Sequence, residues 1–470
     1  MEVRETAAGP MRIESDPLGS VEVPISARRG PQTQRALDNF RLSGTPISAM
    51  PDLIKAMAWV KRAALRANLS GGVLDPDVAE AIDRACGEII DGQWREEFVV
   101  DVYQGGAGTS TNMNLNEVIA NRALELLGKP RGAYWIVSPN DHVNLSQSTN
   151  DAYATAVRLA VFSMNQRLVA SLWRLSSAMG IKARAFAGIA KLGRTQLQDA
   201  VPMTLGEEFG AYAATIAEDA ERASEIGQLF LEVNIGGTAI GTRIGAGELY
   251  GAEVVSALRE VSGLPVVAAA NLIEATWDMG AFVLYSGMLK RIASKLSKIA
   301  NDLRLLSSGP RGGFAEIILP QRQPGSSLMP GKVNPVMPEA INQIAFRVFG
   351  ADTTITFAAE AGQLQLNAFE PVIVWSLHEA TSLMSAGIQA LIDNCILGIE
   401  ANPAACEYNL ARSMAGATEL VSYVGYARAA EIAQYALAEG LDLVSAAERL
   451  DPALAALWAA DGAARKMRAT

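Results

Sequence analysis

The chain has 470 residues, half of them hydrophobic, a net charge of −10 and a pI near 5.0. This acidity, without a dense run of lysine and arginine, argues against a nucleic-acid-binding surface. No apolar run reaches the roughly 18 residues that span a bilayer, and the first residues lack the apolar segment of a signal peptide. Three scattered cysteines suit a reducing compartment, so we expect a cytoplasmic protein. With two histidines and no paired cysteines, we expect no metal and no cofactor.

Residues 1–35 mix proline, glycine and arginine without a regular period, and we expect them to be irregular. Two helical patterns follow within residues 50–97, and helical periodicity resumes at 117–127. We therefore predict a mostly helical N-terminal domain over residues 1–149.

Long helical patterns dominate residues 152–398. Apolar residues between Leu289 and Leu306 alternate steps of three and four, which is a heptad seam. Similar patterns occupy 152–188, 209–233, 336–358 and 372–398. Helices of about 25–30 residues are at least twice the usual length. Five of them predict a central long-helix bundle, which we assign to residues 150–402.

Residues after Asn402-Pro403 are again helical and rich in alanine, and they predict a small C-terminal helical domain over 403–470. Much of the bundle is apolar on more than one helix face. Such faces are often buried against further copies of the same chain, so we expect a homo-oligomer. A monomer with thick layers of helices is the alternative.

Four polar clusters interrupt this apolar chain, each at an expected helix boundary. They are Gly108–Asn114, Gln147–Asp151, Gly193–Asp199 and Gly325–Pro335. Helix capping explains one or two Ser, Thr, Asn or Asp residues in a cluster, but not runs of four to six. The last cluster, with its Gly-Ser-Ser start and Pro-Gly centre, predicts a loop, for which a plain linker is the alternative.

Pooled, the clusters supply many neutral hydrogen-bond donors and few cations, which suits small carboxylates as ligands. Donors of this kind stabilise the charge that a neighbouring carbanion places on a carboxylate. A Ser-His-Asp triad has little support, since His142 is the only histidine near a cluster and no Gly-x-Ser-x-Gly motif is present. No glycine-rich nucleotide-binding motif is present either. For His142 itself a structural role is the better interpretation.

The Gly325–Pro335 segment resembles the signature loop of the aspartase/fumarase superfamily. The segments Gly106–Asn114, Asn140–Asp151 and Gly193–Pro202 resemble its other active-site segments, in the same order. The resemblance runs from about residue 11 to residue 445. Fumarases carry a histidine where Gln196 stands, so the detail favours the aspartase branch. Hydration of a double bond needs a group that activates water, whereas ammonia is already a nucleophile.

This resemblance implies an all-α, three-domain lyase that assembles as a homotetramer with a multi-helix core and active sites shared between subunits. It implies a carbon–nitrogen lyase that eliminates ammonia reversibly from L-aspartate to give fumarate. Ser326 would be the base that removes the Cβ proton, assisted by Lys332, and closure of the loop would gate the reaction. The implied contacts are Thr109, Ser148, Thr149 and Ser327 to the β-carboxylate, Lys332 and Asn334 to the α-carboxylate, and Asn150, Thr195 and Gln196 to the amino group.

Several positions depart from the superfamily pattern. Leu145 stands where a lysine is usual, and Pro24–Pro31 and Val421-Ser422 replace characteristic residues. Residues 1–10 precede Met11-Arg12-Ile13-Glu14, which resembles a typical start. These departures leave open a lyase that uses another amine or nucleophile with fumarate, or a fumarase. A helical scaffold without catalysis is the hypothesis from a different class, and the retention of Ser326 and Lys332 counts against it.

Overall fold

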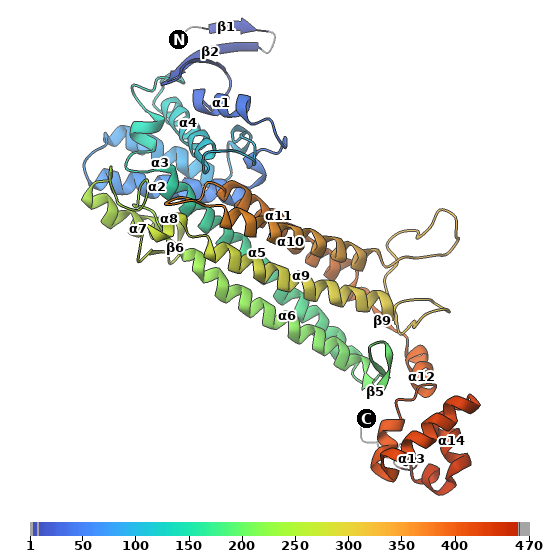
Figure 1. The fold of residues 1–470 in the computed structure, drawn as a ribbon. Helices are drawn as coiled ribbons and strands as arrows, with labels where there is room; N and C mark the ends of the chain where they lie inside the picture. The colour runs from blue at the N-terminus through green and yellow to red at the C-terminus, as the bar shows by residue number, and fades with distance from the viewer. Residues whose placement is uncertain (1–2, 7–8, 459, 461–470) are drawn as a thin grey trace. The chain divides into compact units, whose positions relative to one another are not determined.

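The structure is a computed structural model that describes residues 3–6, 9–458 and 460 (Figure 1). The chain forms two compact units, and each is described by itself. The first unit comprises Met1–Val169, Arg222–Arg291 and Arg347–Leu383, and the second comprises Ala170–Glu221, Ile292–Phe346 and Met384–Thr470. Helices dominate both units, which confirms the predicted helical class. No helix in the described part of the chain is long and apolar enough to cross a membrane.

The first unit begins with an antiparallel sheet, not with the irregular segment that we expected. Its strands are β1 (Val3–Thr6), β2 (Gly9–Asp16) and β3 (Gly19–Pro24). The prediction fails here because Arg12, with no exposed surface, gives these residues a buried anchor. Its guanidinium pairs with Glu14 at 2.6 Å and donates to the carbonyls of Pro24 and Ala27 at 2.7 Å each. Residues 1–2 and 7–8 of the expected irregular segment lie outside the described residues.

The first unit also contains helices that are shorter than the five long helices described below. They are α1 (Pro31–Asn39), η1 (Ile47–Ala49), α2 (Pro51–Ser70), α3 (Pro76–Ile90), η2 (Arg95–Glu97), α4 (Thr109–Leu126) and the π-helical η3 (Pro139–Val143). The elements η4 (Gln228–Leu231), β6 (Glu232–Val233), α7 (Glu248–Ser262), β7 (Val267–Ala268) and α8 (Glu274–Trp277) follow later in the chain. Helix α2 packs against both α3 and α7, and it is buried along most of its length.

Five long helices confirm the predicted bundle (Figure 1). They are α5 (Thr149–Ala185), α6 (Leu205–Gly227), α9 (Gly280–Leu306), α10 (Val336–Glu360) and α11 (Glu370–Asn394), and each contributes residues to both units. The heptad seam of α9 is buried as expected, from Leu289 to Leu306. The pattern at 209–233 overestimates its helix, because the chain leaves α6 at Gly227 and continues through η4 into β6.

The second unit carries a hairpin and the C-terminal helices. The hairpin pairs β4 (Ala190–Thr195) with β5 (Gln198–Thr204), and β8 (Ile317–Ile318) pairs with β9 (Glu400–Ala401). The helical elements are η5 (Ile396–Gly398), α12 (Pro403–Ala411), α13 (Ala417–Glu439) and α14 (Leu443–Leu450). Asn402 caps α12 through its side chain. The domain boundaries at 149/150 and 402/403 stay predictions.

Candidate active site

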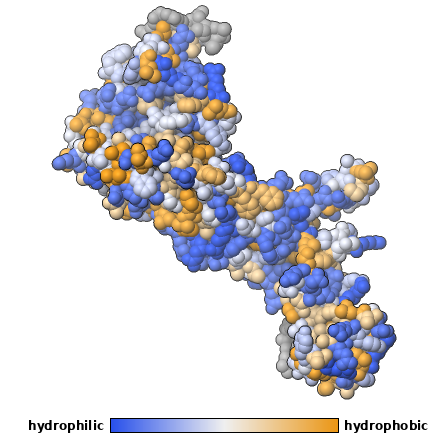
Figure 2. Space-filling view, in the orientation of Figure 1, coloured by the Kyte–Doolittle hydropathy of each residue, from blue (hydrophilic) through white to orange (hydrophobic). Residues whose placement is uncertain are grey.

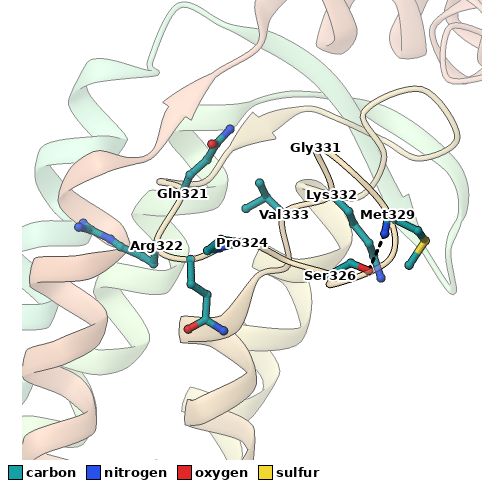
Figure 3. A pocket seen from close by; sticks show the side chains of 9 residues that line it. Gln321, Arg322, Pro324, Ser326, Met329, Gly331, Lys332 and Val333 are labelled. Carbon is teal, nitrogen blue, oxygen red and sulfur yellow. Dashed lines mark hydrogen bonds between the residues drawn. The ribbon is translucent and has the colours of Figure 1, made fainter.

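The loop at Gly325–Pro335 lines a pocket of about 530 Å³ together with the residues that precede it (Figure 3). The loop is held in shape at its base. The Gly325 amide donates to the carbonyl of Lys332 at 2.7 Å, and Asn334 Nδ2 donates to the carbonyl of Gly325 at 2.8 Å. A Cβ at Gly325 would lie 2.4 Å from that Lys332 oxygen, so only glycine allows this closure. The loop is therefore a defined polar turn and not a featureless linker.

Ser326 has the environment of a stabilised oxyanion. Its Oγ accepts hydrogen bonds from the amides of Leu328 at 3.1 Å and Met329 at 2.9 Å. Two donors aimed at one oxygen favour negative charge on it. Lys332 is exposed, and its side chain runs toward the Ser326 side of the loop in the view of Figure 3. Ser327 is exposed in the same turn.

Ser148, Thr149 and Asn150 form the start of α5. The Asn150 amide donates to Ser148 Oγ at 3.2 Å, and the Ser148 amide donates to Asp151 Oδ1 at 2.9 Å, which is a capping box. Capping therefore explains part of this cluster. It also orders the first turn of a 37-residue helix, whose N-terminal dipole favours an anion beside Thr149.

Asp151 fixes this helix start to a second segment of the same unit. Its other oxygen, Oδ2, accepts from the amides of Gly236 at 3.1 Å and Thr238 at 2.9 Å. Burial raises the pKa of Asp151 to about 6, while these amide donors act in the opposite direction. The Asn150 side chain donates to the carbonyl of Ala239 at 2.8 Å, so the same segment also orients the candidate amine contact.

Thr109 is the first residue of α4, after Gly108 in the left-handed conformation. It is exposed, and its hydroxyl donates to the carbonyl of Gly106 at 2.7 Å. One turn further, Asn112 Nδ2 donates to Thr149 Oγ1 at 3.0 Å. This bond joins the N-terminal turns of α4 and α5, so the structure brings two of the predicted segments together in the first unit.

Thr195 and Gln196 lie at the tip of the β4–β5 hairpin. The cluster at Gly193–Asp199 was expected at a helix boundary, and this expectation is wrong. The cluster instead forms a two-residue turn in which Gln196 and Leu197 have φ of 53° and 62°. A Cβ at Gly193 would lie 2.7 Å from the carbonyl oxygen of Val201 across the hairpin, which requires glycine there. Thr195 and Gln196 are exposed, and within the described residues no hydrogen bond or ion pair joins them to the loop.

A buried ionic cluster holds the base of this hairpin. Glu316, with no exposed surface, pairs with Arg194 at 2.8 Å and with Lys191 at 3.0 Å. Lys191 also pairs with Glu208 at 2.6 Å, and Asn409 of α12 donates to Glu316 at 3.1 Å. The hairpin is thus fixed to the chain segment that leads into the loop.

Sequence reasoning missed Lys61, which is 1% exposed in α2. Its ammonium donates to Asn144 Oδ1 and to Gln147 Oε1, each at 2.9 Å. The signal that could have found it is a lysine that directly follows the apolar run Ala56–Val60 on the buried side of a helix, because a cation there needs buried acceptors. Among the described residues, no group of three or more His, Cys, Asp or Glu side chains is arranged to hold a metal ion.

Comparison with known proteins shows which family this chain belongs to. Residues 19–350 match the family described as "Lyase". An aspartate ammonia-lyase of Pseudomonas canavaninivorans is 54% identical over 453 residues, which is 96% of each chain. That of Escherichia coli (strain K12) is 50% identical over 417 residues, 88% of this chain and 87% of the relative.

Solved structures agree with these relatives. A protein from Brucella melitensis described as "fumarate lyase:delta crystallin", bound to cobalt, superposes with a TM-score of 0.93 at 54% identity, covering 95% of this chain and 97% of that one. The class II fumarase of Schistosoma mansoni superposes with a TM-score of 0.90 at 32% identity, covering 94% and 95%. The chain therefore belongs to the lyase family, as a member of the aspartase/fumarase superfamily with aspartate ammonia-lyases among its relatives.

Proposed function

We propose that this enzyme is an aspartate ammonia-lyase, which eliminates ammonia reversibly from L-aspartate to give fumarate. Its identity of 50–54% with aspartate ammonia-lyases over most of the chain supports this activity. The observation that carries the chemistry is the pair of backbone amides directed at Ser326 Oγ. A serine needs such donors to act as a base, because the free hydroxyl is far too weak an acid.

In the proposed reaction the Ser326 alkoxide removes a proton from Cβ of L-aspartate. The electron pair moves into the β-carboxylate and forms its aci dianion. When this intermediate collapses, the pair forms the Cα–Cβ double bond and the carbon–nitrogen bond breaks. The amino group leaves from its ammonium form as neutral ammonia, which then takes up the proton left on Ser326. The chain's own groups supply every step.

The substrate contacts follow the chemistry of the side chains. Thr109, Ser148, Thr149 and Ser327 donate hydroxyl hydrogens to the β-carboxylate, where the transition-state charge accumulates. Lys332 and Asn334 bind the α-carboxylate. Asn334 Nδ2 donates one hydrogen to the carbonyl of Gly325, and its second hydrogen is available for the α-carboxylate. Asn150, Thr195 and Gln196 contact the amino group.

The proposed assembly is a cytoplasmic homotetramer whose subunits share active sites. Large apolar side chains on the long helices support it: Phe346 is 61% and Phe357 is 70% exposed. Exposed aromatic rings of this size are typical of surfaces that become buried on assembly. We keep residues 1–149, 150–402 and 403–470 as the proposed domains.

The test follows the ultraviolet absorbance of fumarate in purified protein given L-aspartate or L-malate. We expect fumarate from L-aspartate, a loss of at least about 1,000-fold in kcat for Ser326→Ala and no change in the melting temperature. Fumarate from L-malate instead would assign the enzyme to hydration, and full activity of Ser326→Ala would remove the serine from the role of base.

A further inference from the structure

A layer of polar side chains, of which Lys61, Asn112 and Asn116 are buried, lies next to Thr149 in the first unit. Its centre is Asn144 Oδ1, which accepts three hydrogen bonds: from Lys61 Nζ at 2.9 Å, and from Asn112 Nδ2 and Asn116 Nδ2 at 3.1 Å each. The oxygens Asn112 Oδ1 and Asn116 Oδ1 are buried without a hydrogen-bond partner among the described residues. Two acceptor oxygens of this layer thus remain unpaired, and an ammonium, which only donates, is suited to such surroundings.

The layer is connected to the candidate site through one side chain. Asn112 uses its two amide hydrogens for Asn144 Oδ1 and for Thr149 Oγ1, the latter at 3.0 Å. Because Thr149 Oγ1 accepts this bond, its own hydrogen remains available to a ligand. Hydrogen bonds therefore connect a buried cation to a hydroxyl at the N-terminus of α5, through Lys61, Asn144, Asn112 and Thr149 in turn.

We propose that Lys61 is a positioning residue for the substrate's β-carboxylate, acting through Asn144 and Asn112 on the Thr149 hydroxyl. Lys61 holds Asn144 Oδ1 in the position where Asn112 also donates to it, and this orients the Asn112 amide so that its other hydrogen points at Thr149 Oγ1. The positive charge of Lys61 then lies behind the hydroxyl that donates to the aci-carboxylate, and it favours this doubly charged form over the resting carboxylate. The inference rests on the proposed function and adds to it a residue that does not touch the substrate. It also places a cation behind the segment in which Leu145 replaces the usual lysine.

The charge state of Lys61 follows from its surroundings. Burial lowers its pKa to about 7, and the Asp151 carboxylate acts in the opposite direction. The test is therefore made near pH 6.5, where the ammonium predominates. It measures binding by calorimetry and not turnover, so it can succeed or fail independently of the proposed function.

Two probes are used, one that resembles the resting carboxylate and one that resembles the aci-carboxylate intermediate. Succinate is an unreactive dicarboxylate, and the pre-ionised nitronate of 3-nitropropionate has the planar, doubly anionic oxygen pair of the aci form. For Lys61→Met we expect the nitronate Kd to rise by about 30-fold and the succinate Kd by less than about 3-fold, because only the nitronate carries the additional negative charge that Lys61 favours. Equal weakening of both probes would overturn the proposal.

Asn68 provides a matched control on the same face of α2, two helical turns after Lys61. Its side chain holds the same segment, donating to the carbonyl of Leu145 at 2.9 Å and accepting from Ser146 Oγ at 2.7 Å, but it has no bond to Asn112 or Thr149. We expect Asn68→Ala to change both probe affinities by the same factor. If Asn68→Ala instead reproduced the selective loss, Lys61 would act only by anchoring the segment.

A double-mutant cycle tests the route through Thr149. Once Thr149→Val has removed the hydroxyl, a further Lys61→Met change is expected to weaken nitronate binding by less than about 3-fold. If the double variant instead lost nitronate affinity by the product of the two single-variant losses, Lys61 and Thr149 would act independently, and the route through Thr149 would be contradicted. If the methionine variant does not fold, the cycle is repeated with Lys61→Gln, which keeps a hydrogen-bond donor without the charge. Melting temperatures are recorded for every variant.

Discussion

The buried ammonium of Lys61 links protonation to stability. Its pKa falls from the ordinary 10.5 to about 7 in the folded chain. Between these pH values the unfolded chain binds a proton that the folded chain has released, so raising the pH favours folding. We expect the unfolding free energy of the wild type to rise by a few kcal/mol between about pH 7 and pH 10, relative to Lys61→Met. Denaturant titrations at several pH values measure it, and a pH-independent difference would mean that Lys61 keeps an ordinary pKa.

Glu117 caps a helix to which it does not belong. Gly30, the residue before α1, offers no side-chain cap. Instead the Glu117 carboxylate of α4 accepts from the amides of Gly30 and Gln32 at 2.8 Å each, and from the amide and hydroxyl of Thr33 at 3.1 and 2.5 Å. A Cβ at Gly30 would lie 2.8 Å from Glu117 Cδ, so the close approach also needs this glycine.

Glu117→Gln is expected to lower the unfolding free energy by about 2–4 kcal/mol, because the new amide NH₂ faces backbone donors in a buried site. Thr33→Val, which removes one of the four bonds, should cost less, about 1–2 kcal/mol. Denaturant unfolding compares the two variants. A neutral effect of Glu117→Gln would show that the carboxyl is already protonated in the folded chain.

At the scale of single residues, the sequence indicated which kinds of side chain form the candidate site better than it indicated which residues those side chains contact. The Ser326 and Thr149 segments could be recognised because runs of hydroxyls and amides are rare in an apolar helical chain. Lys61, Asn112 and Glu117 act through contacts with residues 32 to 87 positions away in sequence, and spacing alone does not reveal such contacts.

Among the elements, the hairpin depends most on a single side chain. Glu316 is the shared partner of Lys191 and Arg194, and all three are mostly buried. Glu316→Gln leaves Arg194 without a carboxylate partner and leaves Lys191 with Glu208 alone, so it should reduce the unfolding free energy by about 3–5 kcal/mol. Glu208→Gln is the control, because Glu208 is partly exposed and pairs with Lys191 but not with Arg194, and it should cost about 1 kcal/mol or less. Equal costs would show that burial does not determine the strength of this cluster.

The long helices could be predicted because their apolar residues repeat over 23 to 37 positions. The strands could not. β2, β3, β4 and β5 hold six to eight residues each, and they depend on anchors such as Arg12 and Glu316 that come from tertiary packing. The helical pattern at 209–233 failed for a related reason, since apolar periodicity continues into η4 and β6 after the helix has ended.

At the scale of the whole molecule, the expectation of an oligomer rests on large hydrophobic side chains that are exposed at the surface. Figure 2 shows hydrophobic residues at the surface among the hydrophilic ones, and Phe346 and Phe357 lie on α10. We expect a tetramer by light scattering. Phe357→Glu should shift it toward smaller species, because a carboxylate buried in an apolar interface is costly. A monomeric wild type would contradict the shared sites.

Mixed tetramers test that sharing directly. Ser326→Ala and Thr149→Val are each expected to be inactive, but a site that takes these residues from different subunits is intact in about a quarter of random combinations. Co-unfolded and refolded mixtures should therefore recover up to about a quarter of the wild-type activity. Mixtures that stay inactive would place both residues in the same subunit.

The two-residue turn at Gln196-Leu197 also has an evolutionary consequence. A turn this short can gain one residue only by becoming a longer loop or by forming a β-bulge, and either change alters the backbone that carries Gln196. Changes in chain length are therefore expected to displace Gln196, the proposed contact to the amine. Descendants of this enzyme that accept another nucleophile should differ by replacement at Gln196, with the hairpin length unchanged.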